Sequence, residues 1–426
     1  MKESQYKGLN QKTVGNTGSI SAGQNLSINA EKDIVNKGSV LAADKNLDLN
    51  AGQNVDIVTV ANEKHVGVVC SGSSAEIHSV DNQQSVLTGG NVNINAGNDV
   101  NIQGGLIAAD KDTAVKAGGN VNINAVKDSY SEETQVGSRG GSNYYHDKVV
   151  DEKVKGTNIA GKEDISVSAG SDINVKGSSL TSEEGKASLA AGGNVNITNE
   201  NEYHEKLHES HEKSKGFLSS KTTDIYDYSN ISGVVSSNVS AGSVDIQSGK
   251  DTNVKGSSVI AKENINISGS NVNIENTDSI YNAQEKHEFK RSGLSVSIGG
   301  QVIDKVNEAV SHVERANQVE DKRLAALHGY KAVESIEKNA GLIKDAAKDP
   351  SKGVSINVSI GSTKSKSESS STTVVANGSN VKAEGDVKIT STEKDINIKG
   401  SNVEGRDVTL DAKENLNITA SETTNK

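Results

Sequence analysis

The sequence contains few of the residues that usually fill or cross-link a globular core. Its 426 residues include one cysteine, one proline, no tryptophan and two phenylalanines, and only 33% are hydrophobic. The single cysteine, Cys70, excludes an internal disulfide bond. The shortage of aromatic side chains makes a thick core hard to assemble, whereas a narrow interior lined by small aliphatic residues would not need them.

The chain also lacks an excess of positive charge and any long hydrophobic run. Its net charge is −11, which argues against binding nucleic acid through a basic surface. No stretch of about 18 consecutive apolar residues is present, and the opening MKESQYKGLNQKTVGN has no apolar segment of a signal peptide. We therefore expect either a protein that stays inside the cell or a fragment of a longer exported chain.

What the sequence does contain, many times over, is a short alternation of asparagine and aliphatic residues. The stretch GGNVNINAGNDVNI at 89–102 is an example, and alternation with period two is typical of a strand with one buried face. The Asn or Asp that opens each alternation recurs in steps of 8 and 13 residues, as at Asn25, Asp33, Asn46 and Asn54. A unit of about 21 residues is too short for a domain and is typical of one turn of a solenoid.

This repeat predicts an all-β fold, a right-handed parallel β-helix with protruding β-hairpin excursions and one helical insert. Coils should stack at about 4.8 Å with Asn and Asp ladders at the corners. Within one solenoid over residues 1–426, the predicted repeat blocks are 20–58, 89–125, 162–198, 241–275 and 384–420. The predicted excursions are 59–88, 126–161, 199–240 and 276–383. The predicted core residues are Val92, Ile94, Val121, Ile123, Ile173, Val195, Ile197, Ile265, Ile267, Ile396 and Ile398.

The last excursion contains two further patterns. Alternating residues at 292–300 and 352–362 predict two strands that pair as an antiparallel ribbon. Between them, apolar residues at helical spacing predict a helical insert over 302–348, which Asp349-Pro350 ends. Its apolar face either packs on itself or the solenoid, or serves as a docking face for a partner or lipid.

One segment formally matches a zinc-peptidase motif. In HEKLHESHEK, His204 and His208 have the HExxH spacing, with Glu205 between them. A third ligand at the metzincin position is missing, because that residue is Ser214, and His211 lies at a spacing unlike that of known peptidases. We therefore expect a solvated hairpin, keep these histidines only as weak metal candidates, and predict no metal centre.

Other catalytic patterns are absent from the sequence. Cys70 follows the apolar run VGVV, where a buried or half-buried small residue is more plausible than a nucleophile. The glycine-rich stretches lack both a GxGxxG turn before a helix and a Walker lysine. We predict no catalytic residue and no cofactor. A β-helical polysaccharide-active enzyme is the weaker alternative, because its aspartates would cluster on one strand face and aromatic residues would bind the sugars.

The repeats AGGNVNINA, AGNDVNIQGG, GSSVIAKENINI and KDINIKGSNV, interrupted by excursions such as EKHEFKRSGLSVSIGG, resemble a known family. They are similar to the haemagglutinin-repeat region of filamentous-haemagglutinin-like exoproteins, which include adhesins and contact-dependent inhibition proteins of the two-partner secretion pathway. The likeness covers nearly the whole chain, and RLAALHGYKAVES at 323–335 also resembles an insert of such repeats.

The resemblance implies a secreted, non-enzymatic shaft at the bacterial cell surface. Its implied partners are an outer-membrane secretion protein and the surface of a host or neighbouring bacterial cell, with no nucleic acid. Two roles follow from it, an adhesive shaft for cell contact and, as the alternative, a segment that delivers a toxin. The sequence shows no amino-terminal secretion domain and no toxin domain, so we expect a fragment of a longer exoprotein.

Overall fold

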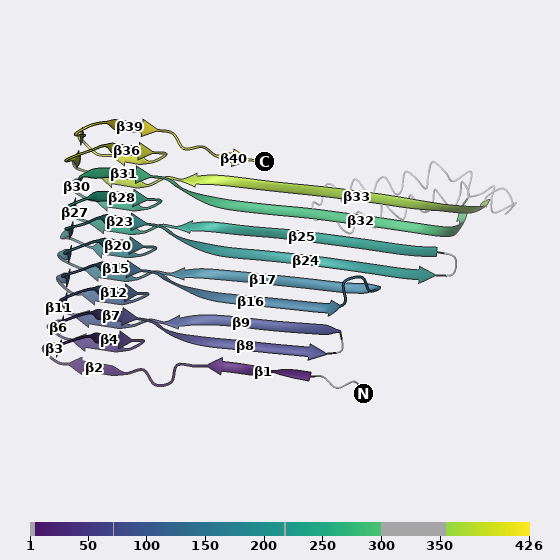
Figure 1. Ribbon diagram of the computed structural model, residues 1–426, viewed down its shortest axis with the longest axis horizontal. Coiled ribbons are helices and arrows are strands. Elements are labelled where there is room, and N and C mark those ends of the chain that lie inside the picture. The colour runs from purple at the N-terminus through teal and green to yellow at the C-terminus, as the bar shows by residue number, and fades with distance from the viewer. Residues whose placement is uncertain (1–4, 71, 217–218, 300–354) are drawn as a thin grey trace, which may run out of the picture. The chain divides into compact units, whose positions relative to one another are not determined.

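The fold of the chain is a parallel β-helix in the computed structural model, which describes residues 5–70, 72–216, 219–299 and 355–426. The predicted all-β solenoid is confirmed: three ten-stranded sheets, here called wall 1, wall 2 and wall 3, run parallel and stack coil upon coil (Figure 1). The described residues contain no helix, so none of them forms a helix with the length and apolar character needed to cross a membrane. The helical insert predicted over 302–348 lies outside the described residues.

Each coil contributes one short strand to each wall in turn. Wall 1 consists of β2 (Ser19–Ala22), β5 (Val40–Ala43), β10 (Val86–Gly89), β13 (Leu106–Ala109), β18 (Asn158–Gly161), β21 (Ser179–Ser182), β26 (Asn238–Ala241), β29 (Ser258–Ala261), β34 (Asn380–Ala383) and β37 (Asn402–Glu404). Wall 2 consists of β3 (Leu26–Ala30), β6 (Asn46–Ala51), β11 (Asn91–Ala96), β14 (Thr113–Ala117), β19 (Ile165–Ala169), β22 (Lys186–Ala191), β27 (Ser243–Ser248), β30 (Ile265–Gly269), β35 (Val387–Ser391) and β38 (Val408–Asp411). Wall 3 consists of β4 (Ile34–Lys37), β7 (Val55–Val58), β12 (Val100–Gln103), β15 (Val121–Asn124), β20 (Ile173–Lys176), β23 (Val195–Thr198), β28 (Asp251–Lys255), β31 (Asn271–Glu275), β36 (Ile396–Lys399) and β39 (Leu416–Thr419).

The interior is a set of aliphatic columns that run along the stack. In β11, Val92 and Ile94 are fully buried while the asparagines between them face outward. Ile94 lies in register between Leu49 of the coil below and Val115 of the coil above. All eleven residues named above as core positions are 5% exposed or less. Each buried Val, Leu or Ile side chain contributes about 1.5 to 3 kcal/mol of transfer free energy, so the columns supply the main driving force for stacking.

Asparagine and aspartate ladders join the coils on the outside, and the predicted corner ladders are present. At one corner, the Asp99 carboxylate accepts a hydrogen bond of 2.6 Å from the backbone N–H of Asn120 in the next coil. On wall 3, the side-chain amide of Asn174 donates to Asn122 at 2.9 Å and accepts from Asn196 at 2.8 Å. This outer ladder contains Asp56, Asn101, Asn122, Asn174, Asn196, Asn253, Asn273, Asn397 and Asn417.

The residue after each wall 3 strand determines whether the chain turns into wall 1 or leaves the stack. After alternate strands it is a glycine with positive φ, and the chain turns directly into wall 1; the first three of these glycines are Gly38 at 59°, Gly104 at 62° and Gly177 at 56°. A Cβ on Gly177 would lie 2.6 Å from the Cβ of Glu200, so space and backbone conformation both require glycine. After the other strands the residue has a side chain, as at Asn199, and the chain leaves the stack.

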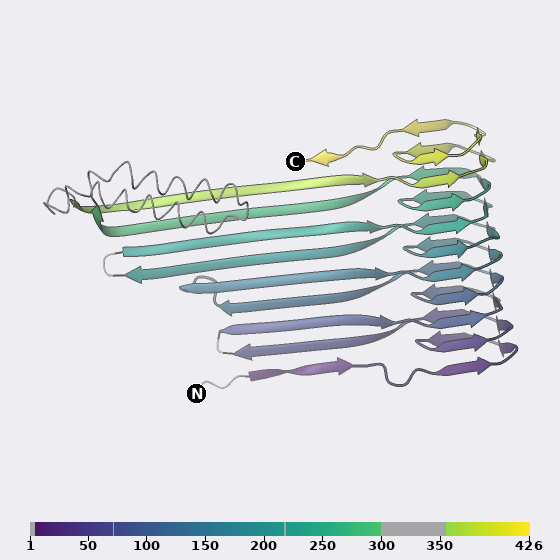
Figure 2. The ribbon, with the colours of Figure 1, turned by 180° about the vertical axis from the view of Figure 1, so that it is seen from behind.

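These departures produce a fourth ten-stranded sheet, here called the hairpin sheet (Figures 1 and 2). The chain leaves after every second coil and returns as an adjacent strand, which gives four strand pairs: β8 with β9, β16 with β17, β24 with β25, and β32 with β33. The last pair contains parts of the ribbon predicted from 292–300 and 352–362. In order, the sheet consists of β1 (Gln5–Lys12), β8 (Val60–Cys70), β9 (Ser73–Gln83), β16 (Val126–Gly137), β17 (Asn143–Lys155), β24 (Glu200–Gly216), β25 (Ser219–Val235), β32 (Thr277–Gly299), β33 (Ser355–Asn377) and β40 (Thr424–Asn425).

The hairpin sheet is continuous because its spacing matches that of the coils. Two coils climb about 9.6 Å, and the two strands of one pair occupy the same distance at about 4.8 Å each. Successive pairs therefore meet at hydrogen-bonding distance, as β9 and β16 do along the register from Ser129↔Val80 to Val136↔Ser73. The excursions, predicted as protruding β-hairpins, are thus parts of one continuous sheet.

The chain divides into two compact units. The first contains Met1–Ser210, Ile225–Lys286 and Glu368–Lys426, which include all three walls and the first two strand pairs. The second contains His211–Asp224 and His287–Ser367. Inside the second unit, Lys364 pairs with Glu288 at 3.0 Å and the ammonium of Lys221 lies 5.6 Å from the centre of the Phe289 ring.

Candidate functional site

The hairpin sheet carries the side chains best suited to recognition. Every histidine, tyrosine and phenylalanine among the described residues lies on one of its strands. The outer faces of the walls instead present amides that already bond to one another, as Asn174 does. The candidate site is therefore this sheet, and the coils hold its strands in place.

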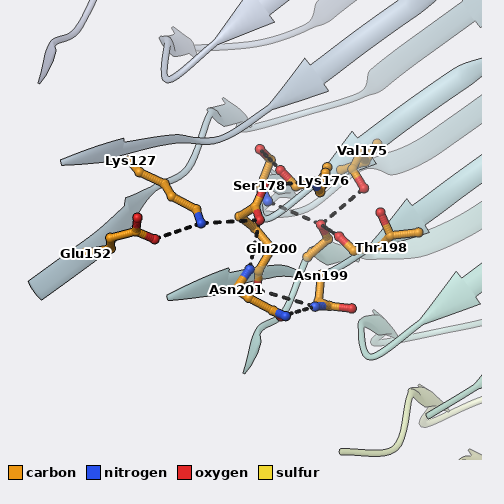
Figure 3. A network of polar contacts seen from close by, with 10 residues as sticks. Lys127, Glu152, Val175, Lys176, Ser178, Thr198, Asn199, Glu200 and Asn201 are labelled. Carbon is orange, nitrogen blue, oxygen red and sulfur yellow. Dashed lines mark hydrogen bonds and ion pairs between the residues drawn. The ribbon is translucent and has the colours of Figure 1, made fainter. Parts of the chain in front are cut away.

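The junction between stack and hairpin sheet is a polar network (Figure 3). Where β23 continues into β24, the Glu200 carboxylate pairs with Lys176 at 2.8 Å and with Lys127 at 3.9 Å. Lys127 also pairs with Glu152 at 2.9 Å. Burial alone would raise the pKa of Glu200, but the two lysines and the Asn201 N–H lower it below its usual value. The network therefore fixes the base of the third strand pair as it leaves the stack.

A buried hydroxyl closes the junction where each strand pair returns to wall 1. The Ser237 hydroxyl contacts the carbonyl oxygens of Thr198 at 2.6 Å and Val175 at 3.2 Å, and accepts a hydrogen bond from the N–H of Ser178. Ser237 is completely buried. The equivalent residues at the other junctions are Ser85, Thr157 and Ser379. Our sequence analysis missed them, although a hydroxyl residue just before the wall 1 strand at each return was the available signal.

The contact between β17 and β24, here called the seam, is rich in charged pairs. Lys148 of β17 pairs with Glu205 of β24 at 2.9 Å, and Tyr203 donates a hydrogen bond to the same carboxylate at 2.7 Å. Burial opposes ionisation of Glu205, but these two donors outweigh it and lower its pKa. The hydrogen bond to Glu205 in turn raises the pKa values of Lys148 and Tyr203. The seam thus combines cross-strand pairing with partly desolvated charges.

A second charged cluster closes the same seam near the β16–β17 turn. Arg139 donates to Glu209 of β24 at 2.6 Å. The His146 ring lies between two carboxylates, with Nε2 at 2.8 Å from Glu133 and Nδ1 at 3.8 Å from Glu209. Tyr144 beside it is only 4% exposed, and burial raises its pKa.

The weak metal candidates do not come together in the structure. His204 and His208 lie on β24, an extended strand, so a spacing of four residues separates them by about 13 Å. Each has its own carboxylate partner: His204 pairs with Asp151, His208 with Asp147 at 2.6 Å, and His211 with Asp224. The HExxH pattern needs a helix to bring both histidines to one metal ion. Over the described part of the chain, no group of three His, Cys, Asp or Glu side chains is arranged to hold a metal ion.

The other singled-out residues also have structural surroundings. Cys70 is exposed at the end of β8, so the expectation of a buried or half-buried position is wrong. His65 and His78 stand opposite each other on β8 and β9, with ring centres 5.9 Å apart and edge to face. His65 Nε2 also contacts the Glu76 carboxylate at 2.6 Å. His65, Glu76 and His78 border a groove that is lined by β1 and by the first two strand pairs.

Comparison with known families gives a match along most of the chain. The model of the Hemagglutinin repeat family matches residues 1–66, 66–146, 137–288, 218–317 and 358–426. The matched ranges include both wall strands and strands of the hairpin sheet. No solved structure is significantly similar to the chain.

Curated relatives include several large toxins. The chain is 33% identical to the 16S rRNA endonuclease CdiA of Enterobacter cloacae over 63% of its own length and 9% of that protein. It is 28% identical to the tRNA nuclease CdiA-2 of Burkholderia pseudomallei over 95% of its length and 14% of that protein. It is 35% identical to Toxin CdiA of Escherichia coli over 42% of its length and 6% of that protein. The chain thus spans a small fraction of the relatives that it matches.

Proposed function

Because the chain belongs to the Hemagglutinin repeat family, we propose that it is a non-enzymatic shaft segment of a secreted exoprotein and that its hairpin sheet contacts the surface of another cell. The observation that carries this proposal is that the walls and the hairpin sheet carry different kinds of polar side chains. The walls use their amides to hold coils together, while the histidines, the tyrosines and most cross-strand ion pairs of the described residues lie on the hairpin sheet. The target is the surface of a host or neighbouring bacterial cell.

The rigidity of the shaft supports this role. Ten coils share continuous apolar columns and continuous ladders, so a strand pair is fixed at its base by the two coils on either side of it. Binding side chains on a rigid support lose little conformational entropy on contact. The proposal includes export through an outer-membrane secretion partner and display at the bacterial surface.

A second candidate function is a delivery segment of a contact-dependent inhibition protein. The specific observation in its favour is the similarity to Toxin CdiA and to the two nucleases named CdiA. In this role the same shaft would carry a toxin that lies elsewhere in the longer protein. The two candidates differ in whether the shaft alone binds cells.

The test removes contact surface and leaves the coils in place. Ser129 and Glu152 are paired across the second strand pair, so residues 130–151 can be replaced by Asn-Gly, which forms a two-residue hairpin turn. We expect binding of the purified chain to cells to fall about tenfold or more, as when contacts at the centre of an interface are lost. A matched control is Lys116→Ser, on the exposed face of wall 2, which should bind normally.

The outcomes separate the candidates. Loss of binding only in the shortened variant, with an unchanged β-type circular dichroism spectrum, supports the contact surface. Equal binding by both variants would reject it. If the intact chain does not bind cells at all, the delivery role becomes the better explanation, and fusing a reporter enzyme to the chain would test it.

A further inference from the structure

The seam between β17 and β24 contains three histidines, each next to a carboxylate on another strand. His204 and His208 of β24 pair with Asp151 and Asp147 of β17. His146 of β17 faces Glu209 of β24. All of these residues belong to the first compact unit. Histidine changes its charge between pH 5 and 8, whereas aspartate and glutamate remain ionised there.

His146 shows most directly why protonation would matter. Its side chain is 15% exposed, and Nε2 can donate a proton to Glu133 of β16 at 2.8 Å. The other nitrogen, Nδ1, is buried with no hydrogen-bond partner and lies 3.8 Å from the Glu209 carboxylate. A neutral ring with its proton on Nε2 therefore directs a lone pair toward a negative charge. A second proton on Nδ1 turns this repulsion into attraction between the imidazolium and the Glu209 carboxylate.

Other charged groups also surround the three histidines. Near His146 these are Lys148 on its own strand and Arg139, which already pairs with Glu209. Near His204 and His208, the same strand contributes Glu202, at 3.7 Å from His204, and Lys206.

On the far side of β24, the only charged residue of β25 between 225 and 235 is Asp227. Protonation of the three histidines would therefore add positive charge among carboxylates on the neighbouring strands.

The preceding contact, between β9 and β16, is built differently. It is joined by the Asn82 side chain, which donates to Asp128 at 3.0 Å, and by Lys155 of β17, which reaches Asp81 at 3.2 Å. His78 of β9 stands opposite the uncharged Ser131. Neither of these joining contacts involves a group that changes charge between pH 5 and 8, so this contact is an internal reference.

We propose that the stability of the seam depends on pH. Protonation of His146, His204 and His208 makes the pairing between the second and third strand pairs more stable. The direction of the pH dependence follows from the linkage between proton binding and folding. A histidine whose protonated form is stabilised in the folded state contributes stability at low pH, and that contribution is lost as the pH rises. Coupling is therefore strong near pH 5.5 and weak near pH 8. The idea that pH regulates the contact surface rests on the proposed function. The stability of the strand pairing at the seam can nevertheless be measured without cells.

The experiment is hydrogen exchange of the full chain at pH 5.5 and pH 8.0, corrected for the intrinsic exchange rate. We expect the backbone amides of β17 and of residues 200–210 to be about threefold to tenfold better protected at pH 5.5, the size expected from three partly exposed ion pairs. The amides between β9 and β16 should show no such change. Equal seam protection at both pH values in the wild type would overturn the proposal.

Three variants make the result specific. His146→Gln with His204→Gln and His208→Gln should abolish the pH response, while the amides of β11 and β14 report that the coils remain folded. His204→Lys with His208→Lys should keep most of the protection at pH 8.0, because lysine stays charged. The control His65→Gln with His78→Gln changes histidines of the first strand pair and should leave the seam response intact. A response that persists in the triple variant would reject the assignment, and none of these readings depends on whether the chain binds cells.

Discussion

At the scale of single residues, a few positions decide whether the chain continues the stack or leaves it. A glycine in the left-handed region closes one wall 3 turn, as Gly177 does, and a residue with a side chain opens the next, as Asn199 does. The alternation between these glycines and residues with a side chain was not predicted from the sequence. The reason is that the role of each glycine depends on the strand pair packed against it, which belongs to the next coil.

Gly177→Ala should destabilise the protein. Alanine at φ 56° is strained, and its Cβ would lie 2.6 Å from the Cβ of Glu200. We expect the free energy of unfolding to fall by about 2 to 3 kcal/mol, measured by urea denaturation. The matched control is Gly233→Ala on β25, where no atom lies within 4 Å of the new Cβ and φ is not in the left-handed region. That variant should stay within about 0.5 kcal/mol of the wild type; equal losses in both would show that the turn conformation is not the cause.

At the scale of elements, the ladders explain why asparagine alternates with aliphatic residues. The aliphatic residues fill the columns, and the asparagines bond from one coil to the next at about the spacing of hydrogen-bonded strands. This much could be derived from the sequence, because the period of two assigns a face to every residue. Residue spacing also predicted where the excursions begin, although it could not show which strands would become neighbours.

Asn174→Ala tests the ladder on wall 3. The change removes one donated and one accepted hydrogen bond in the middle of the ladder, and we expect a loss of about 1 to 2 kcal/mol in the free energy of unfolding. Asn417→Ala, at the last rung, removes only the bond to Asn397 and should cost about half as much. Thermal or urea unfolding followed by circular dichroism gives both values. If the two changes cost the same, the ladder does not act as a connected series.

At the scale of the whole chain, the decisive feature is the match between the strand pairs and the coils. One pair every two coils lets each pair meet the next at hydrogen-bonding distance, and this gives the hairpin sheet its continuity. The histidine–carboxylate contacts of the seam exist only because of this match. His204 and Asp151 are 53 residues apart in sequence, and no local pattern marks them as partners. The HExxH spacing pointed to a helix because the motif by itself carries no information about the strand that contains it.

A change in coil number should break the hairpin sheet. Deleting residues 158–178 removes one coil, so the second and third strand pairs would be separated by a climb of about 4.8 Å where about 9.6 Å is needed. We expect the amides of β17 and residues 200–210 to lose their protection from hydrogen exchange. Deleting 158–237 is the matched control. It removes two coils together with one strand pair, so successive strand pairs are again separated by two coils. In that variant β17 should pair with β32 and remain protected; protection of β17 and β24 in the single-coil deletion would contradict the spacing argument.

The sequence by itself determined the coil, its aliphatic columns and its corner ladders, because these depend on residues that repeat within one unit and on the two faces of a strand. Only the tertiary structure decided that the excursions become one sheet and which histidine meets which carboxylate. Those contacts depend on the rise of the stack, which brings together residues far apart in sequence. A period in the sequence fixes the local geometry, whereas neighbours across coils are fixed only once the coils have stacked.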